Sequence, residues 1–299
     1  KVTKSGVEIE LDYNAFKNKD WSVSVGANAT FVKNKIKNLP ATMKENGYIS
    51  GSKKWLEGKS IYEFWLRQWH GVDPQTGDGL YVADVSKYNQ GNIGTGDGNI
   101  TQSQFDEYKK TVVTIDGKEL TNSYTYAKYD FSGSSIPDVF GGFNVRVSYK
   151  NFDLAAVFSY QLGGQVLDTN YATMMSMTEF GYAQSPDLLK AWKQAGDITE
   201  VPRIDNSAAH TTNIGQSYST RWLTSSDYLN LRSVTIGYQF PKAWLSKVML
   251  KSARLNLTAE NLFMLKARQG LNPMANYSGV TYNEYMPSRN ITLGLNVSF

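Results

Sequence analysis

The last eleven residues, Arg289–Phe299, alternate strictly between apolar and polar side chains. One parity carries only apolar or aromatic residues: Ile291, Leu293, Leu295, Val297 and Phe299. The other carries polar residues and one glycine: Asn290, Thr292, Gly294, Asn296 and Ser298. Successive side chains of a β-strand point to opposite faces, so this period of two predicts a strand with one apolar and one polar face.

The same period recurs upstream, in residues 7–13, 21–31, 143–150, 154–162 and 253–260. These runs reach about eight to thirteen residues, whereas strands of soluble proteins usually have about five or six. A strand that crosses a bilayer at about 45° needs roughly 9–11 residues, so the runs fit a transmembrane β-barrel better. Several apolar rows also end in rings, as an interfacial aromatic girdle requires: Tyr13, Phe31, Tyr149, Phe240 and Phe299.

One of the expected strands changes phase. Leu229 and Leu231 have the opposite parity to the apolar row that runs from Val234 to Phe240. A β-bulge near Arg232-Ser233 would restore one apolar face, and a transition from loop to membrane at that point would explain the pattern equally well.

The connections between the expected strands fall into two classes. Tight turns are predicted at Ala15–Lys19 and Lys150–Phe152, and residues 241–251 form an intermediate connection. Long polar connections are predicted at 34–60, 71–137, 165–226 and 266–288. Short periplasmic turns and long extracellular loops are the asymmetry of outer-membrane barrels. A single helix is predicted, Ser185–Gln194, within the third loop.

Composition argues against most catalytic and metal-binding chemistry. The chain has no Cys and only two His, His70 and His210, so thiolate zinc sites, disulfides and cysteine nucleophiles are excluded. The net charge of +4 is too small and scattered to favour nucleic acid. No apolar run approaches the 18 residues of a membrane helix. We therefore expect no enzyme activity, no catalytic residue, no metal and no cofactor.

Two alternatives to a membrane barrel without enzyme activity are compatible with these patterns. A soluble or surface β-sandwich, acting as an adhesin or binding module, would show the same alternation, although it explains the strand lengths poorly. An outer-membrane barrel enzyme would need a convergent nucleophile and base, for which the two histidines supply little material.

Several motifs carry a resemblance to a known family. Residues 71–78 read Gly-Val-Asp-Pro-Gln-Thr-Gly-Asp, residues 137–144 read Pro-Asp-Val-Phe-Gly-Gly-Phe-Asn, and residues 159–164 read Ser-Tyr-Gln-Leu-Gly-Gly. Residues 6–11, 227–232 and 260–263 add further motifs in the same order. Together they resemble the SusC-like branch of TonB-dependent outer-membrane transporters. The segment 89–132 looks like an insertion, and Met286-Pro287 replaces an expected Tyr-Pro.

The resemblance implies a fold, a function and partners. Residues 1–299 would be the C-terminal part of the transmembrane domain, a plugged antiparallel barrel of roughly 22 strands, while the plug domain and the TonB box have no counterpart in the chain. The implied function is TonB-dependent import of an oligosaccharide or peptide across the bacterial outer membrane. The implied partners are a SusD-like surface lipoprotein, the TonB complex, outer-membrane lipid and the ligand.

Candidate contacts to a ligand or partner are aromatic residues in the expected loops, chosen for their stacking chemistry. They are Trp55, Trp65, Trp69, Tyr81, Tyr171, Trp192 and Trp222. About half of them are expected to be structural. Phe299 is expected to act as the terminal signal for barrel assembly, with a place in the girdle as the alternative.

Other short patterns favour a plain structural interpretation. Gly58-Lys59-Ser60 lacks the first glycine of a P-loop, and residues 96–101 lack the outer carboxylates of a calcium loop. His210 is expected to be solvated. The acidic row Glu8, Glu10 and Asp12 is expected to line a wet lumen rather than to bind an ion.

Overall fold

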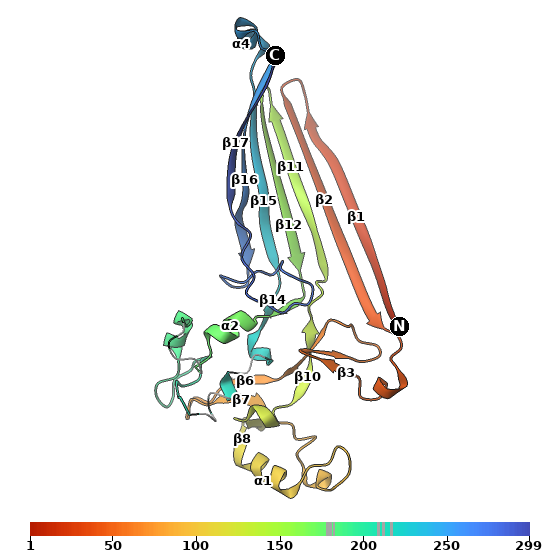
Figure 1. Ribbon diagram of the computed structural model, residues 1–299, viewed down its shortest axis with the longest axis vertical. Coiled ribbons are helices and arrows are strands. Elements are labelled where there is room, and N and C mark those ends of the chain that lie inside the picture. Colours follow the sequence, from red (N-terminus) through yellow and green to blue (C-terminus); the bar gives the residue numbers. More distant parts are fainter. Residues whose placement is uncertain (178–180, 182, 208–209, 211–212, 216–217) are drawn as a thin grey trace.

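The computed structural model describes residues 1–177, 181, 183–207, 210, 213–215 and 218–299. One tall antiparallel sheet forms the upper part of the molecule, and smaller sheets and helices gather at its lower end (Figure 1). Among the described residues, none of the helices combines the length and the apolar character needed to cross a bilayer.

The tall sheet has seven strands in the order β1-β2-β11-β12-β15-β16-β17. Every neighbouring pair is antiparallel, and the order in space follows the order along the chain. The strands are β1 (Val2–Lys17), β2 (Trp21–Ile36), β11 (Val139–Tyr149), β12 (Phe152–Leu162), β15 (Tyr228–Gln239), β16 (Ser252–Lys266) and β17 (Asn290–Ser298). This up-and-down connectivity is that of a barrel wall.

The register of the sheet places the two parities on opposite faces. One row of partners runs Tyr13, Val25, Val145, Ala156, Val234, Ala259 and Ile291. The next row, on the other face, runs Asn14, Ser24, Arg146, Ala155, Thr235, Thr258 and Thr292. We call these the outward face and the inward face, respectively. The alternation seen in the sequence thus becomes one apolar and one largely polar surface.

The outward face is uncovered, as a lipid-facing wall would be. Leu293 of β17 is 69% exposed and Leu11 of β1 is 62% exposed. A β-sandwich would bury such a face against a second sheet about 10 Å away, and none packs there in the described part of the chain. The architecture is therefore that of a barrel wall and not of the sandwich alternative.

The phase break in the sequence of β15 is a β-bulge, and two strands are longer than their periodic patterns. The register between β15 and both of its neighbours shifts between Leu231 and Ser233, so the predicted β-bulge is confirmed. β1 and β2 have 16 residues each, which is longer than predicted. A second bulge between Asn14 and Phe16 allows β1 to continue through the predicted turn, which shrinks to residues 18–20.

All short connections lie at the upper end of the sheet (Figure 1). Asn18 closes the first turn, because its Oδ1 accepts from the backbone N–H of Trp21 at 2.7 Å. The connection between β15 and β16 forms α4 (Lys242–Leu245) and the 3-10 helix η6 (Ser246–Val248). Aromatic rings meet at this end, including Trp21 with Tyr149, whose centroids are 4.4 Å apart. Such rings fit the predicted girdle.

The long connections all lie at the opposite end, hereafter the loop end. The connection after β2 forms a four-stranded sheet with order β10-β5-β4-β3 and another with order β6-β7-β9-β8. The strands are β3 (Tyr48–Ser50), β4 (Lys53–Trp55), β5 (Glu63–Arg67), β6 (Trp69–Val72), β7 (Gly79–Val82), β8 (Val112–Ile115), β9 (Lys118–Thr121) and β10 (Tyr129–Ser134). The connection after β12 contributes the small pair β13 (Gln165–Leu167) and β14 (Leu223–Ser225).

Helices also occur at the loop end. They are α1 (Gln102–Thr111), α2 (Thr169–Met174) and the 3-10 helices η1 (Ala41–Met43), η2 (Gln90–Asn92), η3 (Tyr124–Tyr126), η4 (Pro186–Lys190) and η5 (Thr220–Trp222). The prediction of one helix over Ser185–Gln194 was wrong in two ways. Only a 3-10 helix forms there, and α1, α2 and α4 were missed.

The loops are packed rather than extended. One apolar cluster of the loop end includes Phe64, Leu66, Leu167 and Trp222. A second surrounds Tyr108 of α1. Residues 60–71, left between two predicted loops, thus form β5 and β6 of these small sheets and take no part in the tall one.

Candidate functional site

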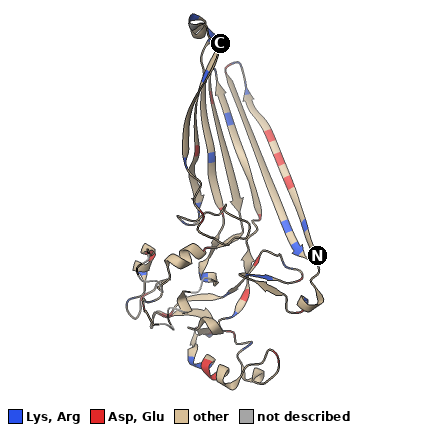
Figure 2. Ribbon diagram, in the orientation of Figure 1, with Lys and Arg blue, Asp and Glu red and all other residues tan. Residues whose placement is uncertain are grey.

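The inward face forms a polar surface between the two ends of the sheet. Arg254 of β16 donates to Asp153 of β12 at 2.7 Å, across β15. Thr235 and Thr258 share a hydrogen bond of 3.1 Å, and Asn296 donates to Asn256 at 3.2 Å. The register places the acidic residues of β1 on the same face. In Figure 2 this strand carries red segments along its length. A wet surface of this kind suits the lumen of a transport barrel.

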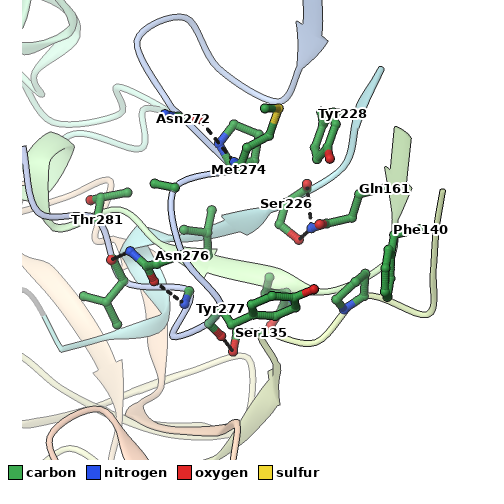
Figure 3. A pocket seen from close by; sticks show the side chains of 17 residues that line it. Ser135, Phe140, Gln161, Ser226, Tyr228, Asn272, Met274, Asn276, Tyr277 and Thr281 are labelled. Atoms are coloured by element: carbon green, nitrogen blue, oxygen red, sulfur yellow. Dashed lines mark hydrogen bonds between the residues drawn. The ribbon is translucent and has the colours of Figure 1, made fainter. Parts of the chain in front are cut away.

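A cavity of about 370 Å³ lies where the inward face meets the loops (Figure 3). Phe140, Gln161 and Tyr228 line it from the ends of β11, β12 and β15. The residues around β13 and residues 272–281 close it from the loop side. We call this space the mouth pocket. Its walls bring together segments that are more than a hundred residues apart.

The lining of the mouth pocket is polar but uncharged. Amide side chains come from Gln161, Gln165, Asn272 and Asn276, and hydroxyls from Ser135, Ser226, Tyr228, Tyr277 and Thr281. Apolar surface comes from residues such as Phe140, Val166 and Met274. None of the described lining residues carries a formal charge. Such a surface can recognise neutral hydrogen-bonding groups, but it offers no counter-charge to an ionic group.

Gln161 and Ser226 form a fixed polar corner of the pocket. The Nε2 of Gln161 donates to Oγ of Ser226 at 2.8 Å and to its carbonyl at 3.1 Å. Ser226 in turn donates to the carbonyl of Gly163 at 3.2 Å. Gly163 has a φ of +74°, and a Cβ there would lie 2.4 Å from Asp138, so this tight turn requires glycine. The corner therefore follows from the Gly-Gly motif that ends β12.

The segment 272–281 is fastened to the loops on both sides. Leu167 donates to the carbonyl of Gly279 at 2.7 Å, and Thr281 donates back to Leu167 at 3.2 Å. Gly279 has a φ of +67°, and a Cβ there would lie 2.3 Å from that of Ser135. Thr281 also donates to Asp168, which forms an ion pair with Arg268 at 2.7 Å. These contacts join the pocket wall to β13 and to the residues around it.

Lys53 lies directly behind this wall. Its ammonium donates to Oγ of Ser135 at 3.2 Å and to the carbonyl of Tyr62 at 2.9 Å, and it sits 3.1 Å from the ring centre of Phe64. Burial lowers the pKa of Lys53 to about 7, against a smaller raising effect of Glu63. Ser135 links Lys53 to the pocket wall, because the Ser135 hydroxyl donates to the carbonyl of Tyr277 at 2.9 Å.

Two of the seven predicted aromatic contacts, Tyr81 and Trp222, are buried in the loops, and Trp69 is partly buried beside them. Tyr81 is fully buried and donates to the carbonyl of Asn213 at 2.6 Å, and Trp222 is 3% exposed. Trp69 packs on Tyr81 with 5.0 Å between ring centres, and Arg221 lies 4.7 Å above its ring. Burial lowers the pKa of Arg221 to about 10. These rings build the loop core.

The other four are partly buried, as Trp69 is. Trp65 stacks on Tyr129 at 6.0 Å, and Trp55 lies 5.4 Å from Tyr48. The hydroxyl of Tyr171 donates to Asp187 at 2.7 Å, and the indole N–H of Trp192 donates to the carbonyl of Pro74 at 2.9 Å. None of the seven lines the mouth pocket. A direct role for them in ligand binding stays a prediction.

The pocket residues themselves were not singled out in the sequence. Gln161 stands inside the Ser-Tyr-Gln-Leu-Gly-Gly motif, which was a usable signal. Ser135 and Asn276 lie in segments without periodicity, and only the fold brings them together. The prediction for His210 was wrong: it is 7% exposed, and its Nε2 lies 2.7 Å from the carbonyl oxygen of Arg203.

Of two further sequence patterns, one has a structural role and the other stays untested. Thr101, at the end of the calcium-loop-like segment, caps α1 by accepting from the N–H of Gln104 at 3.1 Å. Phe299 follows β17 and is 80% exposed, so its part in barrel assembly stays a prediction.

Known proteins are similar to the chain over its whole length. No family model matches. The TonB-dependent receptor P3 of Formosa agariphila is 25% identical over 316 aligned residues, which cover 100% of this chain. The TonB-dependent receptor P39 of the same organism is 24% identical, again over 100% of the chain. The chain is homologous to TonB-dependent receptors. It spans 29% and 30% of the length of these two relatives.

Solved structures share the fold of the chain. A structure of the RagAB peptide transporter matches with a TM-score of 0.75 and 22% identity, over 100% of this chain and 29% of that one. The RagAB peptide importer in its closed-closed state matches with a TM-score of 0.76 and 24% identity. The predicted fold, part of a transmembrane β-barrel, is thereby confirmed.

The homology to TonB-dependent receptors also bears on location and class. It confirms the predicted localisation in the bacterial outer membrane. The relatives are named as receptors and transporters, which agrees with the prediction that the chain is not an enzyme.

Proposed function

We propose that residues 1–299 form the C-terminal part of the barrel wall and outer mouth of a TonB-dependent importer. The inward face then lines the path of the ligand, and the loop end faces the cell exterior, where a SusD-like surface lipoprotein caps it. The similar structures of the RagAB peptide transporter and peptide importer support this assignment. Phe299 then serves as the assembly signal of the barrel.

The ligand class is proposed from the mouth pocket. A peptide presents neutral backbone amides that both donate and accept hydrogen bonds, and it alternates them with apolar side chains. Gln161, Asn272 and Asn276 offer matching amide groups, and Phe140 and Val166 offer apolar surface. The uncharged lining beside an inward polar face is the observation that carries the proposal. An oligosaccharide is the second candidate, because Tyr228 and Tyr277 could contact sugar rings.

A steric variant tests the pocket. Ala275 is exposed and lines the pocket, so Ala275→Trp should fill much of it without disturbing the packed loops. We expect binding of a neutral peptide mixture to the purified protein to weaken at least tenfold, measured by titration calorimetry. Gln269→Trp is the matched control, because Gln269 is exposed on the same connection and does not line the pocket.

The outcomes separate the candidates. Unchanged peptide binding in Ala275→Trp would remove the mouth pocket from the ligand path. Binding of neutral oligosaccharides but not of peptides by the unmodified protein would select the second candidate. Uptake of the ligand that persists in cells lacking TonB would contradict the proposal that TonB supplies the energy for import.

A further inference from the structure

The outward face of β2 changes chemistry near the loop end. From Trp21 to Phe31 its outward side chains are apolar or aromatic, and the same row then continues with Lys33 and Lys35. The register confirms the face, because Val7 pairs with Phe31, Ser5 with Lys33 and Thr3 with Lys35. Figure 2 shows the two basic segments at the lower end of β2.

These two lysines are the only charges at paired outward positions of the described sheet. The other charged residues of β1 and β2 that have a partner, including Glu8, Glu10 and Asp12, belong to the inward rows. Both lysine side chains are exposed, and neither forms an ion pair with any carboxylate in the described ranges. The charge is therefore directed away from the lumen, and no carboxylate among the described residues compensates it.

Their height on the wall can be estimated from strand geometry. The row from Trp21 to Phe31 advances ten residues, or about 33 Å at about 3.3 Å per residue. With a tilt of about 45°, it spans about 23 Å of membrane thickness, close to the apolar band of about 25 Å in outer-membrane barrels. Lys33 is the next outward residue, so it stands at the level where lipid headgroups begin.

We propose that Lys33 and Lys35 bind phosphate groups of lipid headgroups in the leaflet at the loop end. A lysine stem can lie along apolar surface while its ammonium reaches the headgroup layer. Anionic lipids attract each basic residue near their surface, and the attraction falls off within a Debye length. The inference rests on the proposed orientation, in which the outward face contacts lipid.

The test uses protein purified from outer membranes in a non-ionic detergent. The probes are lipid A with both phosphates and the same lipid after enzymatic dephosphorylation. We expect the unmodified protein to bind the phosphorylated lipid about tenfold more tightly, and a Lys33→Gln/Lys35→Gln variant to lose most of that preference. Lys4→Gln is the matched control: Lys4 pairs with Asn34 at the same height but on the inward face.

Each outcome is decisive. A double variant that keeps the phosphate preference, or an unmodified protein without one, would overturn the proposal. Loss of a co-purifying surface lipoprotein with unchanged lipid preference would assign the lysines to a protein partner and also overturn it. Peptide binding in the mouth pocket is expected to be unaffected in the double variant, so failure here leaves the proposed function standing. The double variant should resist detergent denaturation as the unmodified protein does, and this control would show that its barrel is intact.

Discussion

At the scale of single residues, the side of the sheet determines what a position tolerates. Leu295 faces outward and Asn296 faces inward on the same strand. We expect Leu295→Arg to lower the free energy of unfolding by about 2–4 kcal/mol, because a guanidinium would enter the hydrocarbon layer, and Asn296→Arg to cost much less. Urea unfolding of the barrel in lipid vesicles measures both. Equal costs would remove the lipid-facing assignment of this strand.

Lys53 gives the loop end a pH dependence with a defined sign. Its pKa is lowered to about 7 in the folded protein, so between pH 7 and its unfolded value near 10.5 the unfolded state binds more protons. Stability contributed at this site therefore rises with pH across that window, by at most about 1.4 kcal/mol per pH unit. Below pH 7 the contribution is constant.

The control for this prediction is Lys53→Met, which keeps an unbranched side chain and removes the titration. We expect the melting temperature of the natural protein to rise relative to that of the variant between pH 7 and pH 9.5. A constant difference between the two proteins across this range would show that the pKa of Lys53 in the folded protein equals its unfolded value, and would contradict the prediction.

At the scale of elements, alternation alone was enough to predict the wall. Period two located all seven strands of the tall sheet, and the opposite parities of Leu231 and Val234 located the bulge. The structure of the loops was harder to predict from the sequence. β5 and β6 are too short for a periodic signal, and α1 carries only Phe105 and Tyr108 as buried residues. The mouth pocket depends on contacts between distant residues, such as Ser135 with Tyr277. A local sequence pattern cannot predict such contacts, because the two residues are far apart in the chain.

The bulge makes a prediction about deletions. Without Arg232, Leu231 would be followed by Ser233 and Val234 in regular alternation, so the outward row of β15 would stay apolar. Deleting Thr235 would instead turn one part of the strand inside out. We expect the first deletion to assemble in outer membranes and the second to fail, as judged by the heat-modifiable folded band on gels. Assembly of both would show that the register of β15 is not fixed by its outward row.

At the scale of the whole molecule, the two ends of the sheet should lie on opposite sides of the membrane. Ile198 is 97% exposed in a long connection, and Lys19 is exposed in the first short turn. A cysteine at position 198 should react with an impermeant thiol reagent on whole cells, and one at position 19 only after lysis. The reverse pattern would invert the topology. The natural chain has no cysteine, so no background labelling from it is expected.

The large excursion between β2 and β11 begins and ends at strands that are hydrogen-bonded to each other, with Thr30 paired to Phe140. The wall itself therefore holds its two ends together, whatever lies between them. Because each doubling of loop length adds only about 0.6 kcal/mol of closure entropy, such an excursion can be exchanged, shortened or enlarged at little thermodynamic cost to the frame. The molecule is in this respect a fixed rim on which different recognition modules could be mounted, by natural divergence or by grafting in the laboratory.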